Sequence, residues 1–163
     1  MAGKNVAASG GEAPRERVVV ITRIFDASRE LVFEAWTNPK HLARWFGPKT
    51  FTNPVCEVDA RAGGKWRIVM RAPDGTEYPC GGVYEEVRPP EFLSFTNNAV
   101  DNDGNVIIEG HTTVLLEAQG RKTKLTLTTR GKAMVDYAVA YLSGMEAGWT
   151  QSLEKLESEL PSL

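Results

Sequence analysis

The stretch AMVDYAVAYLSGMEAGWTQSLEKLESEL, residues 133–160, has the most regular pattern in the chain and predicts its largest element. Apolar side chains recur there every three or four residues, which places them on one face of an α-helix. They are Val135, Ala138, Leu142, Met145, Trp149, Leu153, Leu156 and Leu160. At 1.5 Å per residue this helix, ended by Pro161, would be roughly 40 Å long. We therefore expect it to cross the whole core.

The composition is that of one ordinary globular domain. The chain has 163 residues, of which 42% are apolar and 25% are charged, and its formal net charge is −2. A chain of this length buries about two-thirds of its unfolded surface. Because there is no positive field and no long run of Lys or Arg, no nucleic acid partner is expected.

The hydropathy and the N-terminus predict a cytoplasmic protein. No run reaches the roughly 18 to 20 consecutive apolar residues that a membrane span needs. The N-terminus also lacks the basic and apolar regions of a secretory signal. Residues 1–16 are rich in Gly, Ala and Ser without periodicity, so we expect a disordered tail there and one folded domain over residues 17–163.

The few cysteines and histidines do not predict a metal or a cofactor. Cys56 and Cys80, like His41 and His111, are scattered singly and lack the spacing of a zinc site. No glycine-rich loop that could cradle a phosphate precedes a helix. We expect two buried thiols in strands and neither a metal nor a cofactor.

Two short helices are predicted after a first strand at residues 17–25. Ser28 suits the N-cap of the first helix because its hydroxyl can accept from the exposed amides of the first turn. Asn38 suits the N-cap of the second, and Pro39 its first helical position.

The second helix brings two large aromatic side chains, Trp45 and Phe46, to one place. Gly47 fits the left-handed position after a helix, and Pro48 prevents its continuation. Because helices this short are marginal alone, the two aromatic rings must pack against the sheet or the long helix.

The middle of the chain predicts an antiparallel meander. Apolar and polar residues alternate in short segments separated by turn residues such as Pro73-Asp74-Gly75. The expected segments cover residues 50–59, 66–71, 76–87, 92–97, 106–117 and 123–130. Together with the first strand we expect six or seven strands. One face of the early strands carries Trp66, Ile68 and Met70, then Tyr78, Cys80, Gly82 and Tyr84.

This order of elements predicts an α+β fold in which a curved antiparallel sheet wraps the long closing helix. One face of such a sheet packs on helix and the other faces water. The two short helices would plug one end. Because such closure is rarely complete, we expect an internal cavity lined by both sheet and helix.

Five motifs resemble a known family in the order in which they occur. They are Trp45-Phe46-Gly47-Pro48, Arg61-Ala62-Gly63-Gly64-Lys65-Trp66, Pro89-Pro90-Glu91, Thr123-Lys124-Leu125-Thr126-Leu127, and Gly148-Trp149 with Leu153 and Leu156. Together they resemble the START-like (SRPBCC) helix-grip superfamily. The most similar group is that of the bacterial proteins similar to the C-terminal domain of the activator of heat-shock-protein-90 ATPase. The resemblance implies a sheet wrapped on the C-terminal helix and a deep pocket, which in relatives holds apolar molecules.

Eleven residues are candidates for lining this pocket. They are Trp45, Phe46, Trp66, Tyr78, Phe95, Tyr137, Tyr141, Gly144, Met145, Gly148 and Trp149. The aromatic residues could equally fill the core. Two glycines inside a helix cost roughly 1 kcal/mol each relative to alanine, so Gly144 and Gly148 either admit a close aromatic ring from the sheet or leave room for a ligand beside a tyrosine hydroxyl.

No catalytic residue is assigned. Glu109 and His111 could form an acid/base pair on one strand. Side chains alternate between the two faces of a strand, however, and Val114 and Leu116 are expected to point inward, so Glu109 and His111 should point toward solvent. An enzyme of the cyclase or hydratase kind would need a titratable group buried in the pocket. The remaining candidates for such a group are Tyr78, Tyr137, Tyr141 and Asp59.

The leading hypothesis is therefore binding of a small, largely apolar molecule with one or two polar groups. The alternative is a protein-interaction module that binds a chaperone or another protein, as a co-chaperone-like ATPase activator would. An exposed sheet edge is also compatible with a homodimer.

Overall fold

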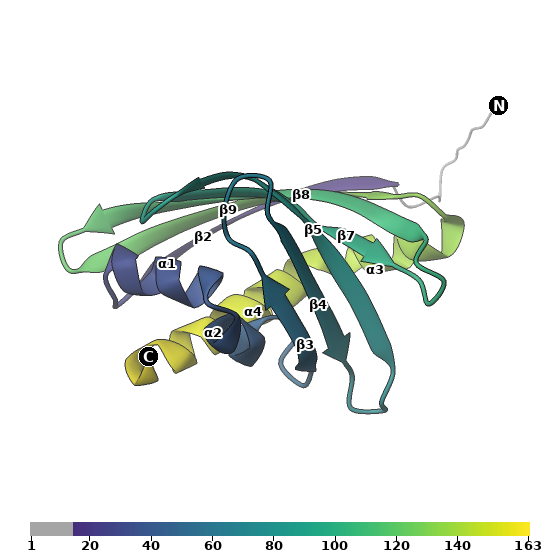
Figure 1. The fold of residues 1–163 in the computed structure, drawn as a ribbon, viewed down its shortest axis with the longest axis horizontal. Helices are drawn as coiled ribbons and strands as arrows, with labels where there is room; N and C mark the ends of the chain where they lie inside the picture. The colour runs from purple at the N-terminus through teal and green to yellow at the C-terminus, as the bar shows by residue number, and fades with distance from the viewer. Residues whose placement is uncertain (1–14) are drawn as a thin grey trace.

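The structure, a computed structural model, describes residues 15–163 as one antiparallel sheet packed on helices. In Figure 1 the sheet lies above, and helices α1, α2 and α4 lie together beneath its curved face. The α+β helix-grip arrangement expected from the sequence is confirmed. The tail predicted for residues 1–16 lies, up to residue 14, outside the described residues, and the first strand begins at Glu16.

The strands and helices follow the predicted order. The strands are β2 Glu16–Phe25, β3 Thr52–Val58, β4 Lys65–Arg71, β5 Glu77–Arg88, β6 Phe92–Thr96, β7 Asn98–Val100, β8 Val106–Gln119 and β9 Lys122–Ala133. The helices are α1 Arg29–Thr37, α2 Pro39–Trp45, α3 Val139–Ser143 and α4 Met145–Glu159, with short 3-10 turns η1 Asp136–Ala138 and η2 Leu160–Ser162.

The strand order β2-β9-β8-β6-β5-β4-β3 puts β2 and β3 at opposite ends of the sheet. The chain therefore has to cross the whole sheet between them, and α1 and α2 make that crossing. The remaining strands are joined largely by tight turns. This described part has eight strands where the sequence predicts six or seven, because three-residue β7 also pairs with β5 and β8.

The predicted caps of the two short helices are present. Oγ of Ser28 accepts from the backbone N–H of Leu31 at 3.2 Å, and Oδ1 of Asn38 accepts from that of Lys40 at 2.9 Å. Both caps satisfy amides that a helix leaves without a partner. Two consecutive caps turn the chain sharply, so that α1 and α2 pack on each other beneath the sheet.

The closing segment differs from the single 133–160 helix that its periodicity predicts. Strand β9 continues to Ala133, where it pairs with Ile108 of β8, and the helical part begins only at η1. Gly144 then separates α3 from α4, with φ −92° and ψ 0°. The 15-residue α4 is about 22 Å long, so the single roughly 40 Å helix is wrong, although a C-terminal helix does pack under the sheet.

The helix break divides the apolar interior into two clusters. The larger lies under α1, α2 and α4 and includes Phe25, Trp45, Leu127 and Leu153, all essentially without solvent exposure. The smaller lies under η1 and α3 and is built from Ile107, Ala133, Ala138 and Leu142. The space between the two clusters is where the candidate site lies.

Candidate ligand-binding pocket

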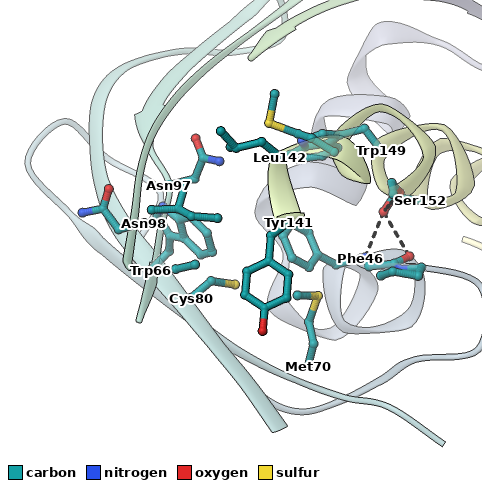
Figure 2. A pocket seen from close by; sticks show the side chains of 16 residues that line it. Phe46, Trp66, Met70, Cys80, Asn97, Asn98, Tyr141, Leu142, Trp149 and Ser152 are labelled. Carbon is teal, nitrogen blue, oxygen red and sulfur yellow. Dashed lines mark hydrogen bonds between the residues drawn. The ribbon is translucent and has the colours of Figure 1, made fainter. Parts of the chain in front are cut away.

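A cavity of about 230 Å³ lies between the curved sheet and the α3–α4 break. Figure 2 shows it with the sheet on one side and the helices with the segment that follows α2 on the other. Its lining residues are Phe46, Gly47, Pro48, Trp66, Met70, Cys80, Asn97, Asn98, Ala99, Ile108, Tyr141, Leu142, Met145, Gly148, Trp149 and Ser152. Its apolar members come from both apolar clusters, so the pocket lies where the two clusters meet without filling the space between them.

One wall is the segment that follows α2. Gly47 has φ +92°, a left-handed conformation that favours glycine, and this turns Phe46 and Pro48 along the cavity. A Cβ on Gly47 would lie 2.9 Å from Sδ of Met70, which lines the same cavity. Glycine at this position therefore lets the loop approach β4 closely.

The polar face of α4 holds that segment in place. The backbone N–H of Gly47 donates to Oγ of Ser152 at 2.9 Å, and the buried Ser152 hydroxyl can donate to the carbonyl of Gly47 or of Gly148, each at 3.0 Å. Nζ of Lys155 lies 3.2 Å from the carbonyl oxygen of Pro48. Partial burial lowers the pKa of Lys155 because the ammonium loses solvation. These contacts fix the loop wall relative to the helix wall.

A continuous group of aromatic rings surrounds the inner end of the cavity. Phe46 lies at its centre, with ring centroids 6.3 Å from Trp45, 6.1 Å from Trp66 and 5.8 Å from Trp149. Trp36 stacks on Trp149 at 5.9 Å and an interplanar angle of 20°. All four tryptophans of the chain belong to this group, so its indole fluorescence reports on the pocket.

Gly148 faces open space. Apart from its two chain neighbours and the backbone of its own helix, no described atom lies within 4 Å of the position that a Cβ would take on this glycine. The interpretation that Gly148 admits a close aromatic ring from the sheet is therefore wrong. Gly144 is different, because it lies at the helix break, and a Cβ there would be 3.8 Å from the carbonyl oxygen of Tyr141.

The lining is almost entirely uncharged. The cavity-lining residues, all in the described range, include no Asp, Glu, His, Lys or Arg. The titratable groups are Tyr141 at the rim and Cys80 on β5. Burial raises the pKa of the Cys80 thiol to about 12, with a smaller effect from Cys56, so the group is a neutral thiol at physiological pH.

The comparison with known families agrees with this geometry. The family model described as Activator of Hsp90 ATPase homolog 1-like protein matches residues 26–161. The chain belongs to this family. The resemblance to the START-like helix-grip superfamily, inferred from five sequence motifs, is thereby confirmed.

Solved structures of similar fold come from several bacteria. The AHSA1 protein from Silicibacter pomeroyi is 28% identical, with a TM-score of 0.76 over 89% of this chain and 98% of that one. A protein from Chromobacterium violaceum is 28% identical, with a TM-score of 0.74 over 88% of this chain and 96% of its own. A protein from Arthrobacter aurescens with a solution structure is 27% identical in sequence, with a TM-score of 0.75 over 90% of this chain and 87% of its own. None of the curated proteins matches the chain.

Six of the eleven residues selected from the sequence line the cavity of this chain. They are Phe46, Trp66, Tyr141, Met145, Gly148 and Trp149. Trp45 and Phe95 lie behind it in the core. Tyr78 lies outside the lining, with its ring 6.5 Å from that of Tyr141. Tyr137 is 57% exposed on η1, and Gly144 lies at the helix break.

Sequence reasoning missed several lining residues. Met70 and Cys80 stand on the strand face that already carries Trp66, so alternation could have identified them. Ser152 could not be found this way, because a serine on a helix next to the apolar stripe has no distinguishing pattern. Asn97 links β6 to β7, and Asn98 is the first residue of β7, a strand that was not expected.

The outward direction predicted for Glu109 and His111 fits the structure. Glu109 is exposed, and Nε2 of His111 lies 2.6 Å from Oε1 of Glu85 on β5. Ser94 also contacts Nε2 of His111, at 3.3 Å, and its hydroxyl donates to Glu85. Serine and carboxylate therefore meet the same ring nitrogen, whereas a Ser-His-acid relay needs one on each. Hydrogen bonding by His111 is the main reason that the pKa of Glu85 is lowered.

Over residues 15–163, no three His, Cys, Asp or Glu side chains gather in a way that could hold a metal ion. No helix in this region has the length and apolar character needed to cross a membrane.

Proposed function

We propose that the chain binds a small, uncharged and largely apolar molecule in the pocket between the sheet and the α3–α4 break. The supporting observation is a cavity of about 230 Å³ whose lining has no charged side chain. Burying an ion there without a partner would cost several kcal/mol or more. An apolar molecule would gain by packing against the cavity-lining surfaces of Trp66, Met145 and Trp149.

The cavity volume limits the size of the ligand. An apolar protein cavity of about 150 Å³ accepts benzene, which has six non-hydrogen atoms. By proportion, a cavity of about 230 Å³ takes roughly nine or ten such atoms. This is the size of a molecule with one ring or with two fused rings. A long acyl chain or a sterol would need either a wider pocket or a part that remains outside.

The same lining favours binding over catalysis. General acid/base or nucleophilic chemistry needs a group whose pKa suits proton transfer near neutral pH. In this cavity the Cys80 pKa is raised to about 12 by burial, so little thiolate is present. Asp59, the carboxylate candidate for an enzyme, lies outside the lining and pairs with Arg61 at 2.9 Å.

A fluorescence titration with indane, a nine-carbon fused-ring hydrocarbon, tests the proposal. We expect a saturable change in indole emission, since Trp66 and Trp149 line the cavity. In Gly148→Leu the new side chain enters the open space beside that residue, and binding should be lost. The matched control is Ala147→Leu, because the neighbouring Ala147 is exposed on α4. Equal binding by both variants would place indane elsewhere and contradict the proposal.

A second candidate is binding to another protein. Val18, Val20 and Ile24 on β2 are exposed and point away from the helices. Exposed aliphatic residues grouped on one strand are typical of interaction surfaces. The name of the matching family includes an Hsp90 ATPase activator. The test is the ATPase rate of the Hsp90 of the same cell with wild type and with a Val18→Ser, Val20→Ser variant. No stimulation by wild type would reject this activity, and sedimentation of both forms would reveal a homodimer through the same strand.

A further inference from the structure

A chain of buried hydroxyls leads from the sheet interior to the pocket. Oγ1 of Thr129 on β9 lies 2.8 Å from Oγ1 of Thr112 on β8, its direct cross-strand neighbour. Thr112 in turn donates to Oδ1 of Asn97 at 2.7 Å. Both threonines are completely buried, whereas Asn97 lies at the cavity lining. Two buried hydroxyls thus end at one amide side chain in the pocket.

The direction of this chain orients the amide of Asn97. Each hydroxyl has one proton, so Thr129 can donate to Thr112 while Thr112 donates to Oδ1 of Asn97. With the amide reversed, Nδ2 would donate to Thr112, Thr112 to Thr129, and the Thr129 proton would have no acceptor among the described residues. A buried hydroxyl without a partner is costly. The oxygen of Asn97 therefore points toward Thr112, and Nδ2 is left for the pocket.

Nδ2 of Asn97 has no hydrogen-bond acceptor within the described part of the chain. The side chain projects from the sheet side of the cavity toward Leu142, whereas that of Asn98 points away from the cavity centre (Figure 2). The Asn98 oxygen accepts from the backbone N–H of Gly110 at 3.2 Å. The pocket therefore presents one oriented amide donor in apolar surroundings.

We infer that Asn97 selects the ligand of this pocket by donating a hydrogen bond from Nδ2 to a carbonyl oxygen of a neutral molecule with one or two rings. This inference rests on the proposed function and adds the ligand class to it. A carboxylate is disfavoured because the lining has no cation to balance its charge. A ligand that can only donate, such as an ammonium ion, leaves the amide protons unpaired. A ketone or aldehyde on a ring fits both the polarity and the size.

The test compares 1-indanone with indane, which share the fused-ring skeleton and differ by one carbonyl. In wild type we expect 1-indanone to bind about three- to tenfold more tightly than indane, the range for one net hydrogen bond. In Asn97→Leu this ratio should fall to about one, while the affinity for indane stays within about twofold. The matched control is Asn102→Leu, at an exposed turn position outside the cavity lining, in which the wild-type ratio should persist.

A second variant keeps the asparagine and removes what orients it. Thr112→Val has nearly the same volume but takes away the proton that holds Oδ1 of Asn97. The amide can then reverse, so the 1-indanone preference should shrink, whereas Thr113→Val on the same strand should leave it unchanged. Thermal unfolding of each variant confirms that it is folded at the temperature of the titration.

The outcomes separate the inference from the proposed function. A preference that is lost in Asn97→Leu and reduced in Thr112→Val supports the inference. Equal binding of the two compounds by wild type, or a preference unchanged in both variants, overturns the inference and leaves the pocket proposal in place. If wild type binds neither compound up to its solubility limit, the pocket proposal fails, and the inference fails with it.

Discussion

Ser152 and Gly47 are joined by a reciprocal pair of contacts across 105 residues of sequence. The N–H of Gly47 donates to Oγ of Ser152 at 2.9 Å, and the hydroxyl lies 3.0 Å from the carbonyl oxygen of the same glycine. One buried side chain thereby accepts from the N–H, and can donate to the carbonyl, of a residue at the loop wall of the pocket. The contact connects stability directly with the shape of the site.

Replacing Ser152 by alanine should destabilise the protein and loosen the pocket wall. The N–H of Gly47 would be left buried without a partner, which typically costs about 1–3 kcal/mol. We expect the free energy of unfolding in urea to fall by this amount and indane to bind more weakly. Ser158→Ala is the control, because that exposed hydroxyl donates only to the carbonyl of Glu154 in its own helix. Equal losses in the two variants would argue against a role for the Gly47 contact.

Replacing Gly148 by alanine should have opposite effects on stability and binding. Outside the neighbouring residues and its own helix backbone, no described atom lies within 4 Å of the new methyl group, so the change raises helix propensity without a clash. The free energy of unfolding should rise by about 0.5–1 kcal/mol, while indane affinity falls because the methyl group occupies cavity space. Ala147→Gly, at the exposed neighbour, should lower stability by a similar amount and leave binding unchanged. A Gly148→Ala variant that loses stability would show that the space beside it is filled.

Replacing Gly47 by alanine should destabilise the protein for two separable reasons. Its φ of +92° is strained for any residue with a Cβ, and the new atom would lie 2.9 Å from Sδ of Met70. We expect a loss of about 1–2 kcal/mol in the free energy of unfolding. A double-mutant cycle with Met70→Ala separates the causes, since the smaller side chain removes only the steric part. If the cycle shows no coupling, the backbone conformation alone accounts for the loss.

The sequence predicted the local structure of the closing segment better than its continuity. Ala138, Leu142, Trp149, Leu153, Leu156 and Leu160 are all buried as the three- and four-residue spacing requires. That spacing continues through a 3-10 turn, a short helix and a longer one, so it carries no information about the break at Gly144. The continuation of β9 to Ala133 depends on pairing with β8, which local spacing also does not encode.

The candidate site was predictable where it depends on large apolar residues and not where it depends on polar ones. The aromatic residues Phe46, Trp66 and Trp149 could be selected from motif and periodicity, and all three line the cavity. The significance of Asn97 depends on Thr112 and Thr129, which lie on two other strands. A relation of this kind appears only when the sheet register is known.

The thiol of Cys80 provides a prediction about pH. Burial raises its pKa from 9.0 to about 12, so the folded thiol stays protonated while the unfolded one ionises near pH 9. Between these two values the unfolded state binds fewer protons than the folded state, and stability must fall as pH rises. The free energy of unfolding of wild type, minus that of Cys80→Ala, should therefore decrease from pH 8 to pH 10.

The same burial should make Cys80 slow to react. The thiolate is the reactive form, and its population at pH 8 is far lower in the folded protein than in the unfolded one. In a Cys56→Ser background, which leaves Cys80 as the single cysteine of the chain, we expect iodoacetamide labelling at least about 100-fold slower than in urea-unfolded protein. Stopped labelling followed by mass measurement gives the rate. Because Cys80 lines the cavity, 1-indanone should slow the labelling of the Cys56→Ser protein further. It should have no such effect when Gly148→Leu is added to that protein. Rapid labelling of the folded protein would mean that the thiol is exposed and that the pocket is open to water at β5.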